Sequence, residues 1–151
     1  MKLRSRFFVL LTLMALGASA SAYAQDVALT REEQVAAIQK LYIPIFDSQW
    51  TRLNALAVKA RLDASTNSQY KFVVADFKQV RVVIDTGLAS TSSELEAVRA
   101  YAEEETGEFA FSIKQLEDAV ASIKTITCVK GTSAKKISAI KPVCPKGYKK
   151  K

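Results

Sequence analysis

The sequence of 151 residues contains no histidine, only two cysteines and only five glycines. Without histidine, the chain lacks Ser-His-Asp triads, Cys-His pairs and the commonest zinc ligand. The scarcity of glycine and cysteine excludes a collagen-like or disulfide-dense protein, and 49% hydrophobic with 25% charged residues is typical of one globular domain. No catalytic residue or cofactor motif stands out, so we predict a protein that is not an enzyme and binds no cofactor.

Residues 1–24 have the three parts of a secretory signal peptide. A start with three basic residues is followed by apolar residues 7–16, a stretch too short to span a bilayer. Small residues then lead to Ala22-Tyr23-Ala24, a cleavage site that makes Gln25 the first residue of the mature chain. No second long apolar run follows. We therefore expect an exported protein without a transmembrane segment in its mature part.

The net charge of +7 is divided unequally along the chain. Residues 25–123 contain 10 Lys and Arg against 15 Asp and Glu, which gives −5. Residues 124–151 contain nine Lys and no acidic residue, which gives +9. We therefore divide the mature chain into an acidic helical body (residues 25–123) and a basic C-terminal element (residues 124–151). Such asymmetry is typical of a tail that meets a polyanion.

The helical body has apolar residues at the spacing of three long helices. The first helix, over 31–62, begins with a capping box at Thr30-Arg31-Glu32-Glu33. Pro44 coincides with a one-residue shift of the apolar stripe, which predicts either one kinked helix or two stacked pieces. The expected core residues of this helix are Val35, Ile38, Tyr42, Ile45, Phe46, Trp50, Leu53, Ala57 and Ala60.

The second helix follows a polar connection at 64–68, and the third begins after a cap at Ser92 or Ser93. Gly87 is predicted to end the second helix in the left-handed conformation, and Gly107 predicts a local bend in the third. The expected core residues are Tyr70, Val73, Phe77, Val80 and Ile84 at heptad spacing, then Leu95, Val98, Ala102, Phe109, Ile113, Leu116, Val120 and Ile123. The predicted fold is all-α, an antiparallel three-helix bundle or coiled coil with a short hairpin after it.

The C-terminal element contains two short β-branched segments, 125–129 and 137–140, which predict a β-hairpin. A two-stranded hairpin alone is marginally stable in water. Because export places both thiols in an oxidising compartment, we expect Cys128 and Cys144 to form a disulfide. That bond would close a loop of 17 residues and stabilise the element by about 3 kcal/mol.

Two other groups of side chains are weaker candidates for a site. The aromatic stripe that includes Trp50 and Phe77 fits a packed core better than a ligand cavity. The acidic run Glu103, Glu104, Glu105 and Glu108 offers oxygen ligands for a cation. Neighbouring side chains in this run diverge around a helix, so we interpret it as a solvated face. A hydrolase that uses two carboxylates distant in sequence is the enzymatic alternative left open.

The run TITCVKGTSAKKISAIKPVCPKGYKKK, residues 125–151, resembles a C-terminal element of small secreted actinobacterial proteins. Those proteins combine Cys-Val-Lys-Gly with Lys-Pro-x-Cys-Pro-x-Gly-Tyr and terminal lysines, and their upstream part is helical like the body of this chain. The family has no characterised function. The resemblance implies an exported protein of an actinobacterium, and it implies no catalytic residue.

We interpret the C-terminal element as a tail that associates with the cell envelope by binding an anionic cell-wall polymer. Tyr148 is its only aromatic ring and no base-reading motif is present, so we expect no specific nucleic-acid recognition. The alternative is a soluble extracellular bundle that binds a small ligand or a metal, with a tail that only adds solubility. The candidate polymer-binding residues are Lys130, Lys135, Lys136, Lys141, Lys146, Lys149, Lys150 and Lys151.

Overall fold

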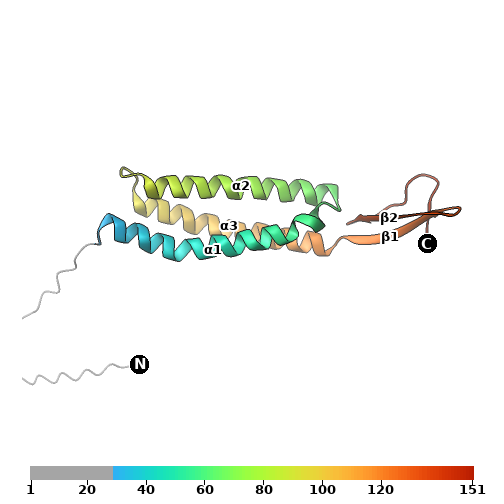
Figure 1. Cartoon of the computed structure of the whole chain (residues 1–151), viewed down its shortest axis with the longest axis horizontal. Coiled ribbons are helices and arrows are strands. Elements are labelled where there is room, and N and C mark those ends of the chain that lie inside the picture. The colour runs from blue at the N-terminus through green and yellow to red at the C-terminus, as the bar shows by residue number, and fades with distance from the viewer. Residues whose placement is uncertain (1–28) are drawn as a thin grey trace, which may run out of the picture.

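The computed structural model describes residues 29–151 as three long helices followed by a small sheet. The elements are α1 (Arg31–Ala60), α2 (Ala64–Ala89), α3 (Leu95–Ala121), β1 (Lys124–Lys130), β2 (Ser133–Ala139) and β3 (Lys149–Lys150). The chain reverses direction at both helix connections, so the three helices lie side by side and the sheet extends beyond one end of them (Figure 1). The prediction of a mostly helical chain with a disulfide-bonded hairpin is confirmed. The signal peptide predicted at 1–24 lies outside the described residues.

Helix α1 begins where the sequence predicts and is continuous through Pro44. The hydroxyl of Thr30 accepts a hydrogen bond from the Glu33 N–H at 3.2 Å, and the Glu33 carboxylate accepts from the Thr30 N–H at 2.8 Å, which completes the capping box. Pro44 lies on an exposed side of the helix. Of the two alternatives for this segment, a single helix is therefore correct.

The core is built from all three helices around Phe77 of α2. The Phe77 ring lies 5.6 Å from Phe46, 5.5 Å from Trp50 and 4.9 Å from Phe109, measured between ring centroids. The buried apolar cluster consists of Ile38, Tyr42, Phe46, Leu53, Val73, Phe77, Val80, Ile84, Leu88, Leu95, Ala102, Phe109, Ile113 and Leu116. The aromatic residues of the sequence stripe are thus mainly core.

One predicted core residue of α1 is wrong. Ile45 is 39% exposed, whereas Phe46 beside it is 1% exposed. The buried positions of this helix are Ile38, Tyr42, Phe46, Gln49, Leu53 and Ala60, and those from Ile38 to Leu53 follow one another every three or four residues. Because α1 is not interrupted at Pro44, its buried stripe has no phase shift, and the polar Gln49 occupies a position inside it.

The start of α2 differs from the prediction. Residues 64–68, expected as a polar connection, form the first turns of the helix. Asp63 caps them, because its Oδ1 accepts a hydrogen bond from the Thr66 N–H at 2.9 Å and another from the Thr66 hydroxyl at 3.0 Å. Ser, Thr and Asn are common both in loops and at the start of helices, so the sequence alone does not distinguish the two here.

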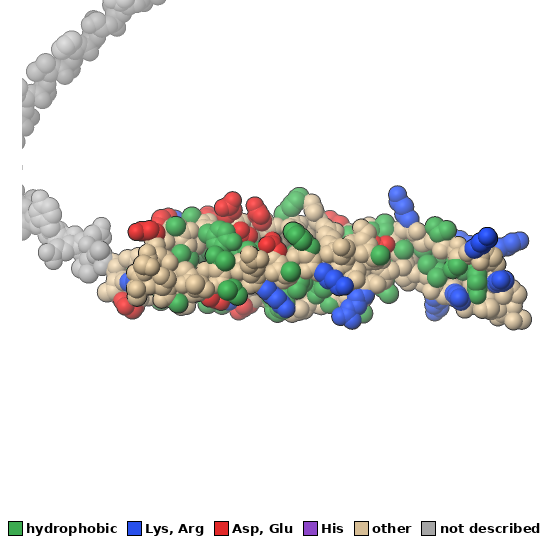
Figure 2. Space-filling view, turned by 90° about the horizontal axis from the view of Figure 1, so that it is seen from above, with side chains coloured by type: hydrophobic (Ala, Val, Ile, Leu, Met, Phe, Trp, Pro, Cys, Tyr) green, Lys and Arg blue, Asp and Glu red, His purple; other side chains and the backbone are tan. Residues whose placement is uncertain are grey.

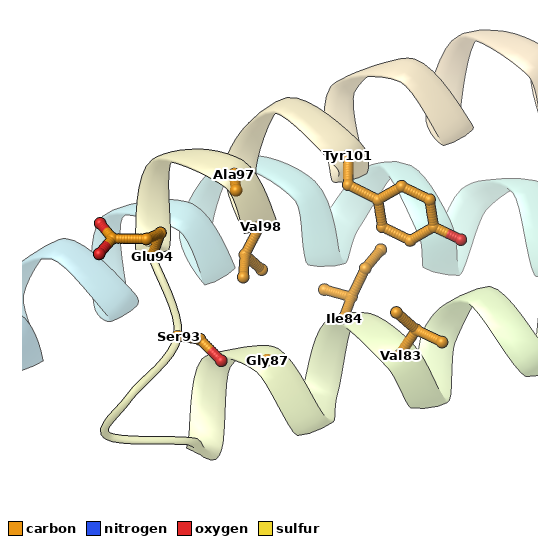
Figure 3. Close-up of a pocket in the computed structure, with 8 residues that line it drawn as sticks. All are labelled: Val83, Ile84, Gly87, Ser93, Glu94, Ala97, Val98 and Tyr101. Carbon is orange, nitrogen blue, oxygen red and sulfur yellow. The ribbon is translucent and has the colours of Figure 1, made fainter.

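Gly87 does not end α2, which continues to Ala89. A Cβ on Gly87 would lie 2.9 Å from Cγ2 of Val98, so glycine permits the close approach of α2 to α3 at this level (Figure 3). The serine caps predicted for α3 are also wrong, because the N-cap residue is Glu94 and it makes no side-chain capping bond. Both errors arise where tertiary packing, rather than local preference, sets the helix boundary.

Helix α3 is unbroken at Gly107, where a local bend was predicted. The apolar stripe lapses there in sequence, but Thr106 is buried at that level and maintains the packed face. Nε2 of Gln49 donates a hydrogen bond to the Thr106 carbonyl at 2.7 Å, while Oε1 of Gln49 is buried without a partner. A polar contact between α1 and α3 thus takes the place of an apolar layer.

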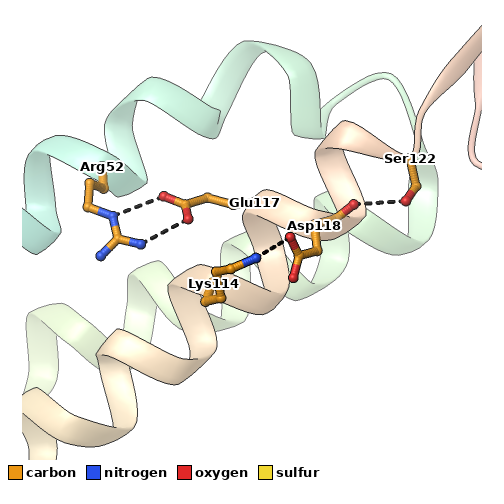
Figure 4. A network of polar contacts seen from close by, with 5 residues as sticks. All are labelled: Arg52, Lys114, Glu117, Asp118 and Ser122. Atoms are coloured by element: carbon orange, nitrogen blue, oxygen red, sulfur yellow. Dashed lines mark hydrogen bonds and ion pairs between the residues drawn. The ribbon is translucent and has the colours of Figure 1, made fainter.

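A second polar contact between α1 and α3 lies near the end that adjoins the sheet (Figure 4). The Arg52 guanidinium donates two hydrogen bonds of 2.9 Å to the Glu117 carboxylate. Within α3, Lys114 pairs with Asp118, whose backbone carbonyl accepts from the Ser122 hydroxyl. The bond from Arg52 holds the pKa of Glu117 below its usual value. This contact fixes α3 against α1 just before the chain enters the sheet.

Candidate functional site

The predicted disulfide between Cys128 and Cys144 is present. Its S–S distance is 2.02 Å and the two Cα atoms are 5.6 Å apart, within the usual range for such a bond. Cys128 lies in β1 and is fully buried, whereas Cys144 belongs to the loop of residues 140–148 that follows β2. The bond therefore ties this loop against one face of the sheet.

The sheet has three strands, in the order β2-β1-β3, where the sequence predicted two. Strand β2 begins at Ser133, earlier than expected, and ends before Ile140; Gly131 turns the chain with a φ of 58°. Lys149 and Lys150, expected to lie in a free tail, pair with Val129 and Cys128 as β3. The N–H of Lys151 extends this pairing by donating to the Thr127 carbonyl at 2.9 Å. The terminal lysines are therefore held in the sheet.

One face of the sheet, here called the closed face, is covered by the loop of residues 140–148. Cys128 and its cross-strand partner Lys135 lie on it, since directly opposed residues point to the same side. Lys135 places its Nζ 5.1 Å from the ring centroid of Tyr148. The Lys130 side chain runs beside Gly147, at 3.5 Å from where a Cβ would lie. These two lysines hold the loop in place with the disulfide.

Contact with β2 also lowers the pKa of Tyr148. Its pKa lies below the usual value for a phenol, first because Ser133 hydrogen-bonds to it and second because the positive charge of Lys135 is close. Both partners come from β2. Tyr148 is thus fastened to the closed face by hydrogen bonding, a cation and the neighbouring disulfide together.

The opposite side, here called the open face, presents alternate residues of each strand. It carries Thr125, Thr127, Val129, Lys136, Ser138 and Lys149, and the pairing places Lys151 on the same side. The hydroxyls of Thr125 and Ser138 are 2.8 Å apart across β1 and β2, which confirms the assignment of this face. Its side chains are exposed or half-buried. Lysines and hydroxyl groups are therefore presented together on a supported surface.

The structure gathers the eight predicted lysines on one small element but divides them between its two sides. All eight are exposed. Lys136, Lys149 and Lys151 lie on the open face, whereas Lys130, Lys135 and Lys150 lie on the closed face and Lys141 and Lys146 in the loop. Figure 2 shows blue side chains at the sheet end and red ones mainly over the other half of the helices. The charge asymmetry of the sequence thus becomes an asymmetry along the length of the molecule.

Asp63 joins the helical body to the C-terminal element, a role the sequence analysis did not detect. Its Oδ1 caps α2, and its Oδ2 accepts a hydrogen bond from the Ile140 N–H at 3.3 Å. These backbone bonds lower the pKa of Asp63, that from Thr66 contributing most. The capping pattern of Asp63 with Thr66 is visible in the sequence, but its second bond spans 77 residues and leaves no local signal.

The acidic run of α3 is not arranged as a metal centre. Within residues 29–151 no group of three or more potential ligands converges on one point. Glu103, Glu104 and Glu108 are exposed, and Glu103 lies 3.7 Å from Arg99. Glu105 is half-buried, and desolvation raises its pKa despite a hydrogen bond from Tyr101. This part of α3 is a charged flank of the helical body.

Two of the open depressions along the helices are lined in part by aromatic side chains. One, of about 310 Å³, lies between α2 and α3 around Gly87 and Tyr101 (Figure 3). The other, of about 470 Å³, lies between α1 and α2 and combines the Trp50 and Phe77 rings with Lys78 and Arg81. Lys78 and Arg81 sit over aromatic rings of the core, and Arg81 is 3.7 Å from Asp47. These cations already have partners within the chain.

No family model, curated protein or solved structure matches this chain. Among the described residues, no helix has both the length and the apolar character needed to cross a bilayer. A function therefore has to be inferred from the molecule itself, and the C-terminal element carries its most unusual combination of charge and construction.

Proposed function

We propose that this chain is a secreted, non-enzymatic helical protein that associates with the bacterial cell envelope through its C-terminal element. The partner is an anionic cell-wall polymer. The observation that carries the proposal is the concentration of nine lysines, with no acidic residue, on a disulfide-bonded element of 28 residues. Lysines that neutralise anionic groups release bound counterions, which drives such binding at low and moderate salt.

The construction of the element favours a binding role over a merely solubilising one. A solubilising tail needs only charge, and runs of like charge stay solvated without a fold. Here a disulfide, three paired strands and the contact of Lys135 with Tyr148 fix the backbone that carries the lysines. Fixed charges lose less conformational freedom on binding than flexible ones, so they bind more tightly.

In this proposal the helical body is an antiparallel three-helix bundle that acts as a spacer. Helix α3, with 27 residues, spans about 40 Å at 1.5 Å per residue. The body carries a net charge of −5, so a polyanion repels it and binding is confined to the basic end. The molecule then stands with its sheet on the polymer and its helices directed away.

One observation favours the alternative of an extracellular small-ligand-binding bundle. The depression of about 470 Å³ between α1 and α2 combines the Trp50 ring with Lys78 and Arg81, groups that suit a planar anion. Because it is open and its cations already contact core rings, we rank it second. In that case the C-terminal element only adds solubility, and its removal leaves the function intact.

Fractionation of an exporting bacterium with an anionic wall tests the proposal. The full chain is compared with a variant in which Lys146, Lys149, Lys150 and Lys151 are replaced by Gln, and with residues 1–123 alone. A control variant loses the same charge from the exposed body residues Lys40, Lys59, Arg61 and Lys71. We expect the full chain and the control in the wall fraction and the other two in the medium. Release of all four chains into the medium would overturn the proposal.

A further inference from the structure

We infer that the open face of the sheet is the surface that contacts the polymer, through Lys136, Lys149 and Lys151. This inference rests on the proposed function and narrows it from a charged element to one side of it. The occupant is a linear polymer whose anionic groups are separated by hydroxyl-bearing units, a polyol phosphate by chemical class. Three observations place the polymer on the open face. They are the strand register, the hydroxyl groups of this face, and the loop of residues 140–148 that covers the closed face.

Strand register places the three lysines at both edges of a narrow surface. Lys136 of β2 is opposite Thr127, and the Lys151 N–H bonds to Thr127 from the other edge. Neighbouring strands lie about 4.8 Å apart, so the two lysine columns are separated by about 10 Å at the backbone. Lys149 adds a second cation on the β3 side, opposite Val129. A chain that crosses the strands therefore meets cations on both sides of β1.

Between the lysine columns the face offers hydroxyl groups. Thr127 lies in the middle row, and the next pair in that direction is Thr125 with Ser138. Each hydroxyl donates one hydrogen bond and accepts others, so it can bind a polyol unit as well as an anionic oxygen. Cations that flank hydroxyls match a polymer in which anions alternate with hydroxyls. A polymer with anionic groups alone can only accept hydrogen bonds from these hydroxyls, so it leaves their acceptor capacity unused.

The closed face has no equivalent surface. The loop of residues 140–148 covers it through the disulfide, and Lys130 and Lys135 lie beside Gly147 and Tyr148 of that loop. The remaining lysines on that side, Lys124, Lys141, Lys146 and Lys150, are exposed, and the strands present no row of hydroxyls between them. These lysines add to the positive potential of the element, but they do not form a surface with a fixed arrangement of cations and hydroxyls.

Two matched variants of the full chain test this inference with poly(glycerol phosphate) as the probe. One replaces Lys136, Lys149 and Lys151 by Gln, and the other replaces Lys141, Lys146 and Lys150. Both lose three charges, and neither alters Lys130 or Lys135. We expect the first to weaken binding at low salt by at least about tenfold and to remove most of its salt dependence, and the second to weaken it less than about threefold.

Thr127→Val provides an independent arm. It should weaken binding to poly(glycerol phosphate) about threefold to tenfold and weaken binding to inorganic polyphosphate by a smaller factor, because only the polyol both donates to and accepts from the Thr127 hydroxyl. Non-reducing mass spectrometry and thermal melting verify that each variant keeps its disulfide and fold. Equal losses in the two triple variants, with tight binding by the native chain, would overturn the open-face assignment and leave the proposed function standing. If the native chain bound neither poly(glycerol phosphate) nor inorganic polyphosphate, the proposed function itself would be overturned.

Discussion

The carboxylate of Asp63 receives hydrogen bonds from two segments that are 74 residues apart: one from the Thr66 N–H at 2.9 Å and one from the Ile140 N–H at 3.3 Å. The first bond starts α2, and the second attaches the residue that follows β2 to the end of the helical body. No helix in the described part of the chain packs broadly against the strands. The orientation of the C-terminal element therefore depends on this carboxylate and on the short link from α3 to β1.

Replacing Asp63 by Ala should loosen the junction without unfolding either part. Because both amides lose their acceptor, we expect hydrogen exchange at Thr66 and Ile140 to accelerate about fivefold to tenfold, and the melting temperature to fall by a few degrees. The exposed Asp85 of the same helix gives the control variant Asp85→Ala. Unchanged exchange at Ile140 in the Asp63 variant would show that the carboxylate does not secure the sheet.

The same carboxylate predicts a pH dependence of the junction. The pKa of folded Asp63 lies below its ordinary 3.8, because the charged form accepts both backbone bonds. Its contribution to stability is therefore complete above pH 3.8 and is lost as the pH falls through the lower folded value. The amide proton shift of Ile140, followed by NMR, should titrate with a midpoint below 3.8. A midpoint at or above that value would contradict the bond.

Two glycines in the helices should respond oppositely to the same substitution. At Gly107 an added Cβ meets nothing within 4 Å, so Gly107→Ala should raise the free energy of unfolding by about 1 kcal/mol, the usual gain in helix propensity. At Gly87 the Cβ would lie 2.9 Å from the branched Val98 side chain, so Gly87→Ala should lower the free energy of unfolding by about 1 kcal/mol. Chemical denaturation measures both. Equal gains would show that α2 and α3 are farther apart at this level.

The core is tested by the pair Phe77→Ala and Glu104→Ala. Phe77 contacts three aromatic rings and is 4% exposed, so its truncation should cost about 3–5 kcal/mol. Glu104 is exposed, and its replacement should change stability by less than about 0.5 kcal/mol. Trp50, the single tryptophan, stacks on Phe77 and reports unfolding by fluorescence. Similar denaturation midpoints for the two variants would mean that the core face is assigned wrongly.

The helices were predictable because their buried residues recur at one period over long segments. The seam of α2, from Val73 through Phe77 and Val80 to Ile84, is buried as the heptad spacing indicates. The helix ends were less predictable. Gly87 has the residue type of a helix terminator, yet it lies within α2, where its lack of a side chain makes room for Val98 of another helix. Gln49 was missed for the same reason, since its side chain is placed by a hydrogen bond to the Thr106 carbonyl of another helix.

The candidate site was predictable in composition but not in geometry. Two cysteines in a chain that is expected to be exported are enough to predict the disulfide, and the lysines are evident from their density. Strand β3 could not be foreseen, because Lys149 and Lys150 have low strand preference and their partners in β1 are distant in sequence. Without this pairing, the sequence does not indicate which of the terminal lysines lie on the open face and which on the closed face.

The salt dependence of binding by the mature chain to purified anionic wall polymer tests the central claim most directly. If the lysines of the open face neutralise three anionic groups, the logarithm of the association constant should fall with the logarithm of salt concentration with a slope of about −2. Binding should be measurable at low salt and several-fold weaker at physiological salt, where the screening length is about 8 Å. A slope near zero, or no binding at low salt, would contradict the account.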